Sequence, residues 1–280
     1  MVMKVRIARR DSSLAKVRRM RRCGPGAVAV VALLACSSAP RAKVRVGHRG
    51  APADRRSAFV LGSPSPSHSS SRVIGTSVRG RPIRVRVVGD PASPRAVLVV
   101  GCIHGDETAG EAVTRRLAAS APRRGVSLWL VQTFNPDGCA AYTRQNARGV
   151  DLNRNSPWRW RPLDHPGGTF YSGPGPLSEP ESRAINRLVR RLRPAVSVWY
   201  HQHAGLVDDS GGDRRVEQRY ARLVGLPFRH FGSFPGSITS WQDATYPGST
   251  AFVVELPAGS LSPSAVGRHA RAVLALAERP

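Results

Sequence analysis

Four apolar runs of strand length, separated by segments with helical spacing, constrain most strongly how this chain can fold. Strands covered on both faces have such continuous hydrophobic sequences, here "RAVLVVGCI", "SLWLVQTF", "AVSVWYHQ" and "GSTAFVVELP". The intervening segments "ETAGEAVTRRLAAS" and "SEPESRAINRLVRRLRP" place apolar residues at the helical period. This alternation predicts an α/β fold, with a mainly parallel or mixed central sheet covered by helices on both faces.

The polar residues that follow these runs form a second pattern. His104, Asn135, His201 and Glu255 lie at or just beyond the carboxyl ends of the four runs. In open α/β sheets, ligands bind where the strands deliver residues at that edge. The irregular segment 135–178, rich in Gly, Pro and Asn, is too long to be an idle connection. We therefore expect a functional site at this edge, with the irregular segment beside it.

The basic character of the chain is concentrated near its start. The formal net charge is +25, and residues 1–72 contribute +14 of it through sixteen Lys and Arg against two acids. No helix-turn-helix, RNA-binding or zinc-finger signature accompanies this charge, which argues against a specific nucleic-acid partner. The charge suits attraction to an anionic surface, such as a cell-wall polymer or an acidic lipid.

Residues 1–36 are typical of a secretory signal peptide. A basic stretch that includes Arg21 and Arg22 precedes the apolar run "GPGAVAVVALLAC", which is too short to span a bilayer comfortably. Met20 opens a signal of ordinary proportions and is an alternative start. The ending "LLAC" resembles the lipobox of bacterial lipoproteins, in which the cysteine, here Cys36, is lipidated. A plain signal peptide is the alternative, and either one predicts export to the cell envelope or the exterior.

Two regions follow the signal. Residues 37–72 are rich in Pro, Ser and Arg, lack periodicity, and are predicted to form a disordered tether. The folded catalytic domain is expected over 73–280, and it begins with alternating apolar and basic residues that predict a pair of strands near a sheet edge. This domain holds Cys102 and Cys139, for which the sequence leaves both a disulfide and two free thiols open.

The segment "GCIHGDET" raises the question of a metal site. A catalytic zinc site needs three nitrogen or oxygen ligands and one open position. His104 and Glu107 can supply two of these ligands, and His201 a third. As an alternative, Glu107 simply favours the N-terminus of the helix that follows. His203 is a rival ligand, because residues two apart on a strand share a face.

Two other segments carry candidate functional groups. The loop "TRQNARGVDLNRN" gathers Arg and Asn side chains that can hold a substrate carboxylate, since Arg pairs bidentately with such groups. A solvated basic loop is the alternative. Glu255 ends a strand that is otherwise apolar. It either pairs with a core arginine or, if buried near a metal-bound water, acts as a general base.

Taken together, "HGDE", "NPDG", "GVDLNRN", a strand ending in histidine, and "VVEL" resemble the zinc carboxypeptidase family over residues 73–280. Within this family the chain is similar to the bacterial branch of murein peptide amidases, which cleave γ-D-glutamyl-diaminopimelate bonds. The resemblance implies a fold of zinc carboxypeptidase type and the following residue roles. One zinc ion is bound by His104, Glu107 and His201, Asp151 orients a histidine ligand, Arg144 stabilises the oxyanion, Asn153 and Arg154 bind the free carboxylate of the substrate, and Glu255 is the general base and acid.

The resemblance also leaves questions. The family's substrate-capping tyrosine would fall in "RHFGSFPGS", which contains Phe231 and Phe234 but no tyrosine. The residues that align with the family's specificity position, Ile238 or Thr239, carry no charge. Diaminopimelate has an amine besides its carboxylates, so a murein substrate requires an acid nearby. The candidate acids are Asp208, Asp209 and Asp243.

These observations predict an exported zinc metallocarboxypeptidase or murein peptide amidase. Its partner is a peptidoglycan-derived peptide that it cuts next to a free carboxylate, and Cys36 offers a membrane anchor. An N-acyl amino acid deacylase of the aspartoacylase or succinylglutamate desuccinylase type would share the zinc ligands, although the full "DLNRN" beside "NPDG" favours the peptidase. A non-catalytic wall-binding module is the third reading, and such a module would be expected to lack a ligand or the base.

Overall fold

A seven-stranded mixed sheet forms the centre of the folded part of the chain. The structure, a computed structural model, describes residues 69–278, so the predicted signal peptide and most of the predicted tether lie outside the described residues. The strands are β1 (Ser69–Thr76), β2 (Pro82–Gly89), β3 (Arg95–Val100), β4 (Val126–Val131), β5 (Val196–Asp208), β6 (Phe228–Arg229) and β7 (Thr250–Pro257). The helices are α1 (Gly110–Ala118), α2 (Pro136–Ala141), the 3₁₀ turn η1 (Leu152–Arg154), α3 (Pro180–Leu192), α4 (Arg214–Val224), α5 (Ile238–Thr245) and α6 (Pro263–Glu278).

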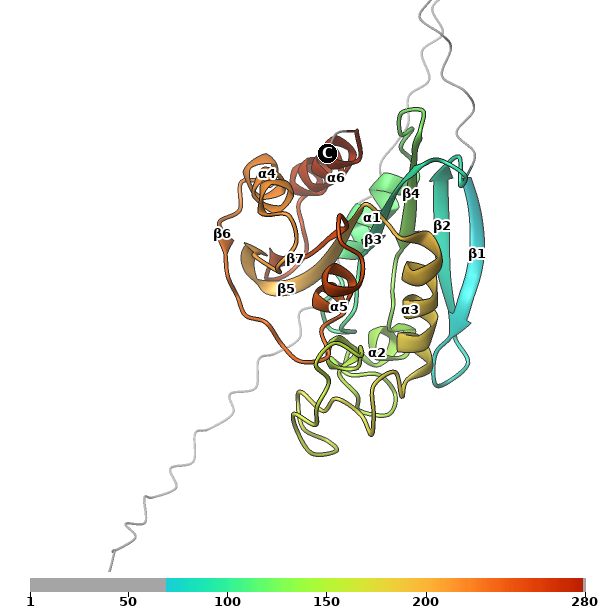
Figure 1. Cartoon of the computed structure of the whole chain (residues 1–280), viewed down its shortest axis with the longest axis vertical. Helices are drawn as coiled ribbons and strands as arrows, with labels where there is room; N and C mark the ends of the chain where they lie inside the picture. Colours follow the sequence, from blue (N-terminus) through green and yellow to red (C-terminus); the bar gives the residue numbers. More distant parts are fainter. Residues whose placement is uncertain (1–68, 279–280) are drawn as a thin grey trace, which may run out of the picture. The chain divides into compact units, whose positions relative to one another are not determined.

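The strand order explains why the sheet is mixed. The strands follow the order β1-β2-β4-β3-β5-β6, and β7 also pairs with β5 (Figure 1). Strands β3, β4, β5, β6 and β7 pair in parallel, whereas β1 and β2 form an antiparallel hairpin that joins the sheet through β4. The predicted mixed sheet is therefore confirmed, and its antiparallel part is the predicted pair of edge strands.

Two hydrophobic clusters cover the two faces of the sheet. One cluster joins the strands to α1, α4 and α6, and the other joins them to α3 and α5. Strand β2 shows how the faces separate, because Ile83, Val85 and Val87 are buried while Arg84 and Arg86 between them are exposed. Helices thus lie on both faces, as the sequence predicts. Within residues 69–278, no helix combines the length and the apolar composition needed to cross a membrane.

The structure departs from the predicted organisation at the start of β1 and in several short elements. Strand β1 begins at Ser69, so residues 69–72, assigned to the tether, pair with β2. Their Ser and Arg side chains are exposed, because an edge strand needs backbone partners but no buried face. The short strand β6 and the helices α2 and α5 were not predicted, and α2 occupies the segment whose "NPDG" indicates a turn. Ser237 caps α5, because its hydroxyl accepts a hydrogen bond from the amide of Ser240.

Candidate active site

The loop after β3 delivers the first two candidate ligands. The amide of Glu107 donates to the carbonyl of His104 at 3.0 Å, a tight turn that brings both side chains to one side. Both side chains are buried. Gly105 lets this loop lie directly against α2, because a Cβ at this position would fall 1.9 Å from the carbonyl carbon of Gly138. The loop is thus held against the protein by backbone packing.

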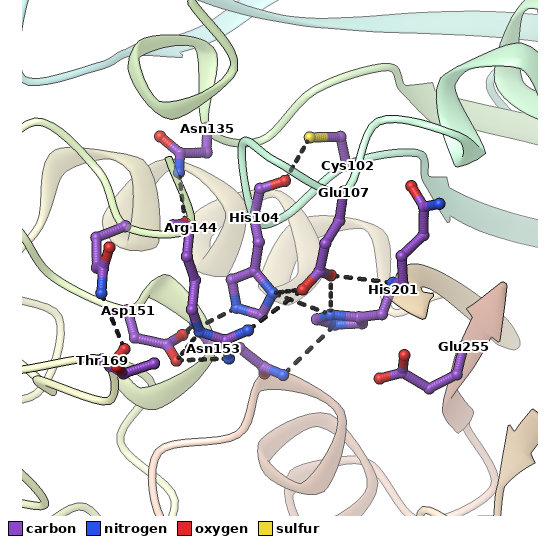
Figure 2. A network of polar contacts seen from close by, with 12 residues as sticks. Cys102, His104, Glu107, Asn135, Arg144, Asp151, Asn153, Thr169, His201 and Glu255 are labelled. Carbon is purple, nitrogen blue, oxygen red and sulfur yellow. Dashed lines mark hydrogen bonds and ion pairs between the residues drawn. The ribbon is translucent and has the colours of Figure 1, made fainter. Parts of the chain in front are cut away.

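Strand β5 delivers the third candidate ligand. It lies beside β3 in parallel, with Val100 opposite Trp199, so His201 emerges next to the loop that carries His104. Nδ1 of His201 lies 3.2 Å from Nδ1 of His104 and 2.9 Å from Oε2 of Glu107. Ligand atoms of His104, Glu107 and His201 all lie within 4.8 Å of one another (Figure 2). The structure therefore brings together the three residues predicted to bind zinc.

The hydrogen-bonding chemistry of this group calls for a cation. Nε2 of His104 lies 3.0 Å from Oδ1 of Asp151, and a carboxylate can only accept, so Nε2 carries the proton. In the neutral imidazole the lone pair of Nδ1 then faces Oε1 of Glu107 at 2.9 Å, which places two acceptors against each other. Positive charge at this point removes the repulsion, and either a proton on Nδ1 or a metal ion can supply it. Zn–N bonds of about 2.05 Å in tetrahedral geometry place two nitrogens roughly 3.3 Å apart, close to the spacing of the two Nδ1 atoms.

Charges in this group also favour a cation. Burial by itself raises the pKa of Glu107 and of Asp151, but the neighbouring histidines more than compensate at Glu107. The pKa of Asp151 is lowered in the same way by nearby positive charges, those of His104, Arg144 and Arg154. The pKa of each carboxyl is thereby held well below its usual range, and both stay ionised at neutral pH. Two imidazoles and a carboxylate with one side open to a cavity are a donor set of the catalytic zinc type.

Arg144 lies next to this group. Its Nε and Nη2 donate to Oδ2 of Asp151 at 3.1 and 2.8 Å, and its Nη1 donates to Oε1 of Glu107 at 3.2 Å. The side-chain amide of Asn135 donates to the carbonyl of Arg144 at 3.3 Å and so holds its backbone. Asp151 thus binds both His104 and Arg144, which fixes the guanidinium beside the candidate ligands.

The turn η1 presents the predicted carboxylate-binding pair. Oδ1 of Asp151 accepts from the amide of Asn153 at 2.9 Å and caps this turn. Arg154 is buried, and its guanidinium lies 4.3 Å from the ring centroid of Phe234 and 5.5 Å from that of Phe170. Within residues 69–278 it forms no ion pair. A buried guanidinium that makes no direct ion pair with a protein carboxylate is suited to receive a substrate carboxylate.

Glu255 lies opposite His201 in the paired strands β5 and β7. Its side chain is buried and forms no ion pair within residues 69–278, so the expected alternative, a structural pair with a core arginine, is not what the structure shows. From the residues that the structure describes, Oε2 of Glu255 accepts only a long contact of 3.4 Å, donated by the amide of Ala204. Figure 2 shows Glu255 on the far side of His201 from Asp151, outside the hydrogen-bonded group. Its carboxylate therefore lines the cavity without a charged protein partner among the described residues.

One cavity of about 350 Å³ connects these residues. All the site residues predicted from the sequence except Asp151, which lies behind His104, line it: His104, Glu107, Arg144, Asn153, Arg154, His201 and Glu255. Three half-exposed phenylalanines, Phe170, Phe231 and Phe234, lie at the same cavity, and its lining within residues 69–278 includes no tyrosine. The cavity therefore combines a candidate metal site, a carboxylate and a guanidinium with an aromatic rim.

Some residues singled out from the sequence lie elsewhere. His203 lines the cavity but is exposed and is not among the grouped ligand atoms. Asn135 caps α2 and supports Arg144 instead of lining the cavity. Asn146 is buried against Glu179 at 2.8 Å, so the predicted Arg and Asn cluster divides into a structural part and a site part. Of the two specificity candidates, Thr239 lines the cavity whereas Ile238 lies in the core.

Two residues that shape the site were not predicted from the sequence. Gln202 donates its backbone N–H to Oε2 of Glu107 at 3.1 Å, and its side chain accepts from the amide of Ala109 at 3.0 Å. Phe170 comes from the irregular segment and stacks on both site arginines, with centroid distances of 5.4 Å for Arg144 and 5.5 Å for Arg154. Neither residue belongs to a motif, so only the folded chain reveals them.

The chain is similar to several known proteins. Residues 61–208 match the family model of the zinc carboxypeptidases. Murein peptide amidase A of Escherichia coli (strain K12) is 32% identical over 184 residues, which cover 60% of this chain and 74% of that protein. Carboxypeptidase SOL1 of Arabidopsis thaliana is 32% identical over 145 residues, which cover 46% of this chain and only 28% of the plant protein.

Solved structures show the same likeness. The murein-tripeptide amidase of Escherichia coli O157 superposes with a TM-score of 0.59 at 25% sequence identity, covering 78% of this chain and 94% of the amidase. Carboxypeptidase A of Helicoverpa armigera superposes with a TM-score of 0.62 at 18% identity, covering 75% of this chain and 70% of the insect enzyme. The second likeness shows the shared fold.

Proposed function

The chain belongs to the zinc carboxypeptidase family, and from that premise we propose that it hydrolyses an amide bond next to a free carboxylate in murein peptides. The observation that carries the proposal is the single cavity that His104, Glu107 and His201 share with Glu255 and the unpaired Arg154. The similarity to murein peptide amidases supports the substrate class. A γ-D-glutamyl-diaminopimelate bond is the expected target.

Each of the residues that line the cavity has its own role in the proposed reaction. A bound zinc ion would act as a Lewis acid that makes water more acidic and polarises a carbonyl group. Glu255 takes a proton from the attacking water and later gives it to the leaving amine. Arg144 donates hydrogen bonds to the developing oxyanion. Arg154 and Asn153 hold the substrate carboxylate, which fixes the scissile bond within the cavity.

The surroundings of the three acids proposed to face the diaminopimelate amine favour one of them. Asp209 pairs with Arg214 at 3.1 Å, and Asp243 accepts from the amide of Ala251 at 2.7 Å outside this cavity. Asp208 is buried, lines the cavity and forms no ion pair within residues 69–278. Its oxygens accept from the amide of Phe231 at 2.7 Å and from the hydroxyl of Ser210 at 2.9 Å. We therefore assign the amine-binding role to Asp208.

Asp208→Asn is expected to lower kcat/KM for a peptide whose side chain at this position carries an ammonium group by about 10- to 100-fold. The substitution removes a buried charge but keeps an acceptor for Phe231, so the fold should persist. A peptide of equal length with an uncharged side chain should be cleaved at an unchanged rate. The matched control is Asp209→Asn, which alters a carboxylate already paired with Arg214. Equal losses for both peptides would show that Asp208 has only a structural role.

The direct test of the function compares substrate classes. The full chain loaded with zinc is expected to release diaminopimelate-containing product from murein tripeptide and to leave N-acyl amino acids uncut. Faster turnover of the N-acyl amino acids would establish the deacylase instead. Turnover of neither class would favour the wall-binding module, although within the described residues both the candidate ligands and Glu255 are in place.

Location is a separate proposal that rests on residues 1–36. The basic stretch, the short apolar run and "LLAC" support export followed by lipid attachment at Cys36. An exported enzyme would meet murein peptides in the cell wall itself. Fractionation of cells that produce the wild type or Cys36→Ser tests the lipid anchor. The wild type is expected in the membrane fraction and the variant outside it, and a variant that stays in the membrane fraction would contradict the anchor.

A further inference from the structure

Cys102 and Cys139 meet directly behind the candidate ligand loop. Their Sγ atoms lie 2.9 Å apart, although 37 residues separate them in the sequence. Cys102 follows β3, is fully buried and precedes His104 by two residues. Cys139 lies on α2 and is half-buried, with its Sγ 3.0 Å from the hydroxyl of Thr133. The two thiols thus lie where the segment that carries two candidate ligands meets the helix that precedes Arg144.

The third potential ligand argues against a second metal site at this point. Glu111 lies close enough to both thiols to complete a group of three potential ligands. Its Oε2, however, already accepts from Arg115 at 3.1 Å and from Gln132 at 2.9 Å. Two thiolates bound to one tetrahedral zinc at about 2.3 Å would lie roughly 3.8 Å apart, so the sulfurs would have to separate by about 0.9 Å. They must approach by a similar amount to form a covalent bond of about 2.05 Å, and that bond needs no third ligand.

We propose that Cys102 and Cys139 are joined by a disulfide in the mature protein. The bond forms by thiol–disulfide exchange with a disulfide-bearing dithiol oxidant, such as a protein oxidase. The half-buried Cys139 attacks one sulfur of the oxidant and gives a mixed disulfide. Cys102 then attacks Sγ of Cys139 and releases the second thiol of the oxidant. Two electrons and two protons pass from the cysteines to the oxidant, which leaves as a dithiol.

The disulfide would brace the candidate active site. It ties the ligand loop to α2 where Gly105 and Gly138 are already in backbone contact. The amide of Phe134 donates to the carbonyl of Cys102 at 2.8 Å in the same region. The cross-link therefore limits the separation of the His104 loop from the segment that positions Arg144. Because a cross-link restricts the unfolded chain as well, it stabilises the folded state.

The test uses the full chain purified without reductant and alkylated before and after reduction. Peptide mass mapping is expected to find the peptides of Cys102 and Cys139 linked, with a mass 2 Da below that of the free pair. Incubation of reduced protein with oxidised glutathione should restore the same link. The inference is wrong if both thiols are alkylated before reduction and stay free after that incubation. A second equivalent of zinc lost in Cys139→Ser would also overturn it.

Reduction gives a second readout. In the wild type it should lower the Tm by several degrees and speed the loss of zinc to a chelator several-fold. The double variant Cys102→Ser, Cys139→Ser should show neither response to reductant, whereas the control Cys36→Ser should respond like the wild type. The mass mapping needs only the wild-type chain, so the inference stays testable even if the double variant folds poorly. If the Tm and the rate of zinc loss to the chelator are the same with and without reductant, the disulfide does not brace the candidate active site.

Discussion

Glu255→Gln is expected to lower kcat for murein tripeptide by about 10²- to 10⁴-fold while one zinc ion stays bound per chain. The substitution keeps the size of the side chain and removes its ability to take up a proton. Glu255 lies outside the group formed by His104, Glu107 and His201, so its loss removes no predicted ligand. Loss of activity with full metal content is therefore the signature of a general base.

The measurement pairs steady-state kinetics with metal analysis of the same preparations. Glu111→Gln is the matched control, because this carboxylate bonds to Arg115 and Gln132 on the protein surface and does not line the cavity. The control should keep activity within a small factor of the wild type. Wild-type turnover in Glu255→Gln would transfer the base role to another residue. Joint loss of zinc and activity would instead make Glu255 a support of the metal site.

His201→Ala is expected to weaken zinc binding by more than about 100-fold, since loss even of a residue that only supports a ligand costs 10- to 100-fold. His203→Ala should keep the zinc affinity of the wild type. Nδ1 of His201 lies 2.9 Å from Glu107 and 3.2 Å from Nδ1 of His104, whereas His203 is exposed outside this group. Equilibrium competition with a chromophoric chelator measures both affinities. The reverse pattern would assign the third ligand to His203.

Much of the fold follows from local sequence patterns. The core strands β3, β4 and β7 were predicted because buried strands require continuous apolar sequence. Helix α5 was not, because its residues Ile238–Thr245 have a weak helical pattern and lie between turn-forming segments. The two-residue strand β6 depends on pairing with the end of β5 alone. Such elements are set by tertiary contacts, which no local pattern encodes.

The site residues that could be predicted from the sequence are those whose positions depend only on the order of the strands in the sheet. His104 follows β3, His201 lies within β5, which continues past the predicted strand end to Asp208, and Glu255 lies within β7. Because β5 pairs in parallel with both β3 and β7, the three residues converge. Buried polar residues with structural roles could not be separated from site residues in this way. Asn146 is of a residue type that can bind a substrate carboxylate, yet its side-chain amide donates a hydrogen bond to Glu179. The choice of Asp208 over its neighbour Asp209 likewise depends on Arg214, a partner visible only in the structure.

The central claim is that three distant stretches of the chain bind one zinc ion beside a free carboxylate. Anomalous diffraction at the zinc edge from crystals of the full chain tests it most directly. The account predicts one strong peak about 2.0–2.2 Å from Nδ1 of His104, Nδ1 of His201 and a carboxylate oxygen of Glu107, within the cavity lined by Glu255. A zinc-loaded crystal with no peak between these residues, or with the ion at another group, would contradict it.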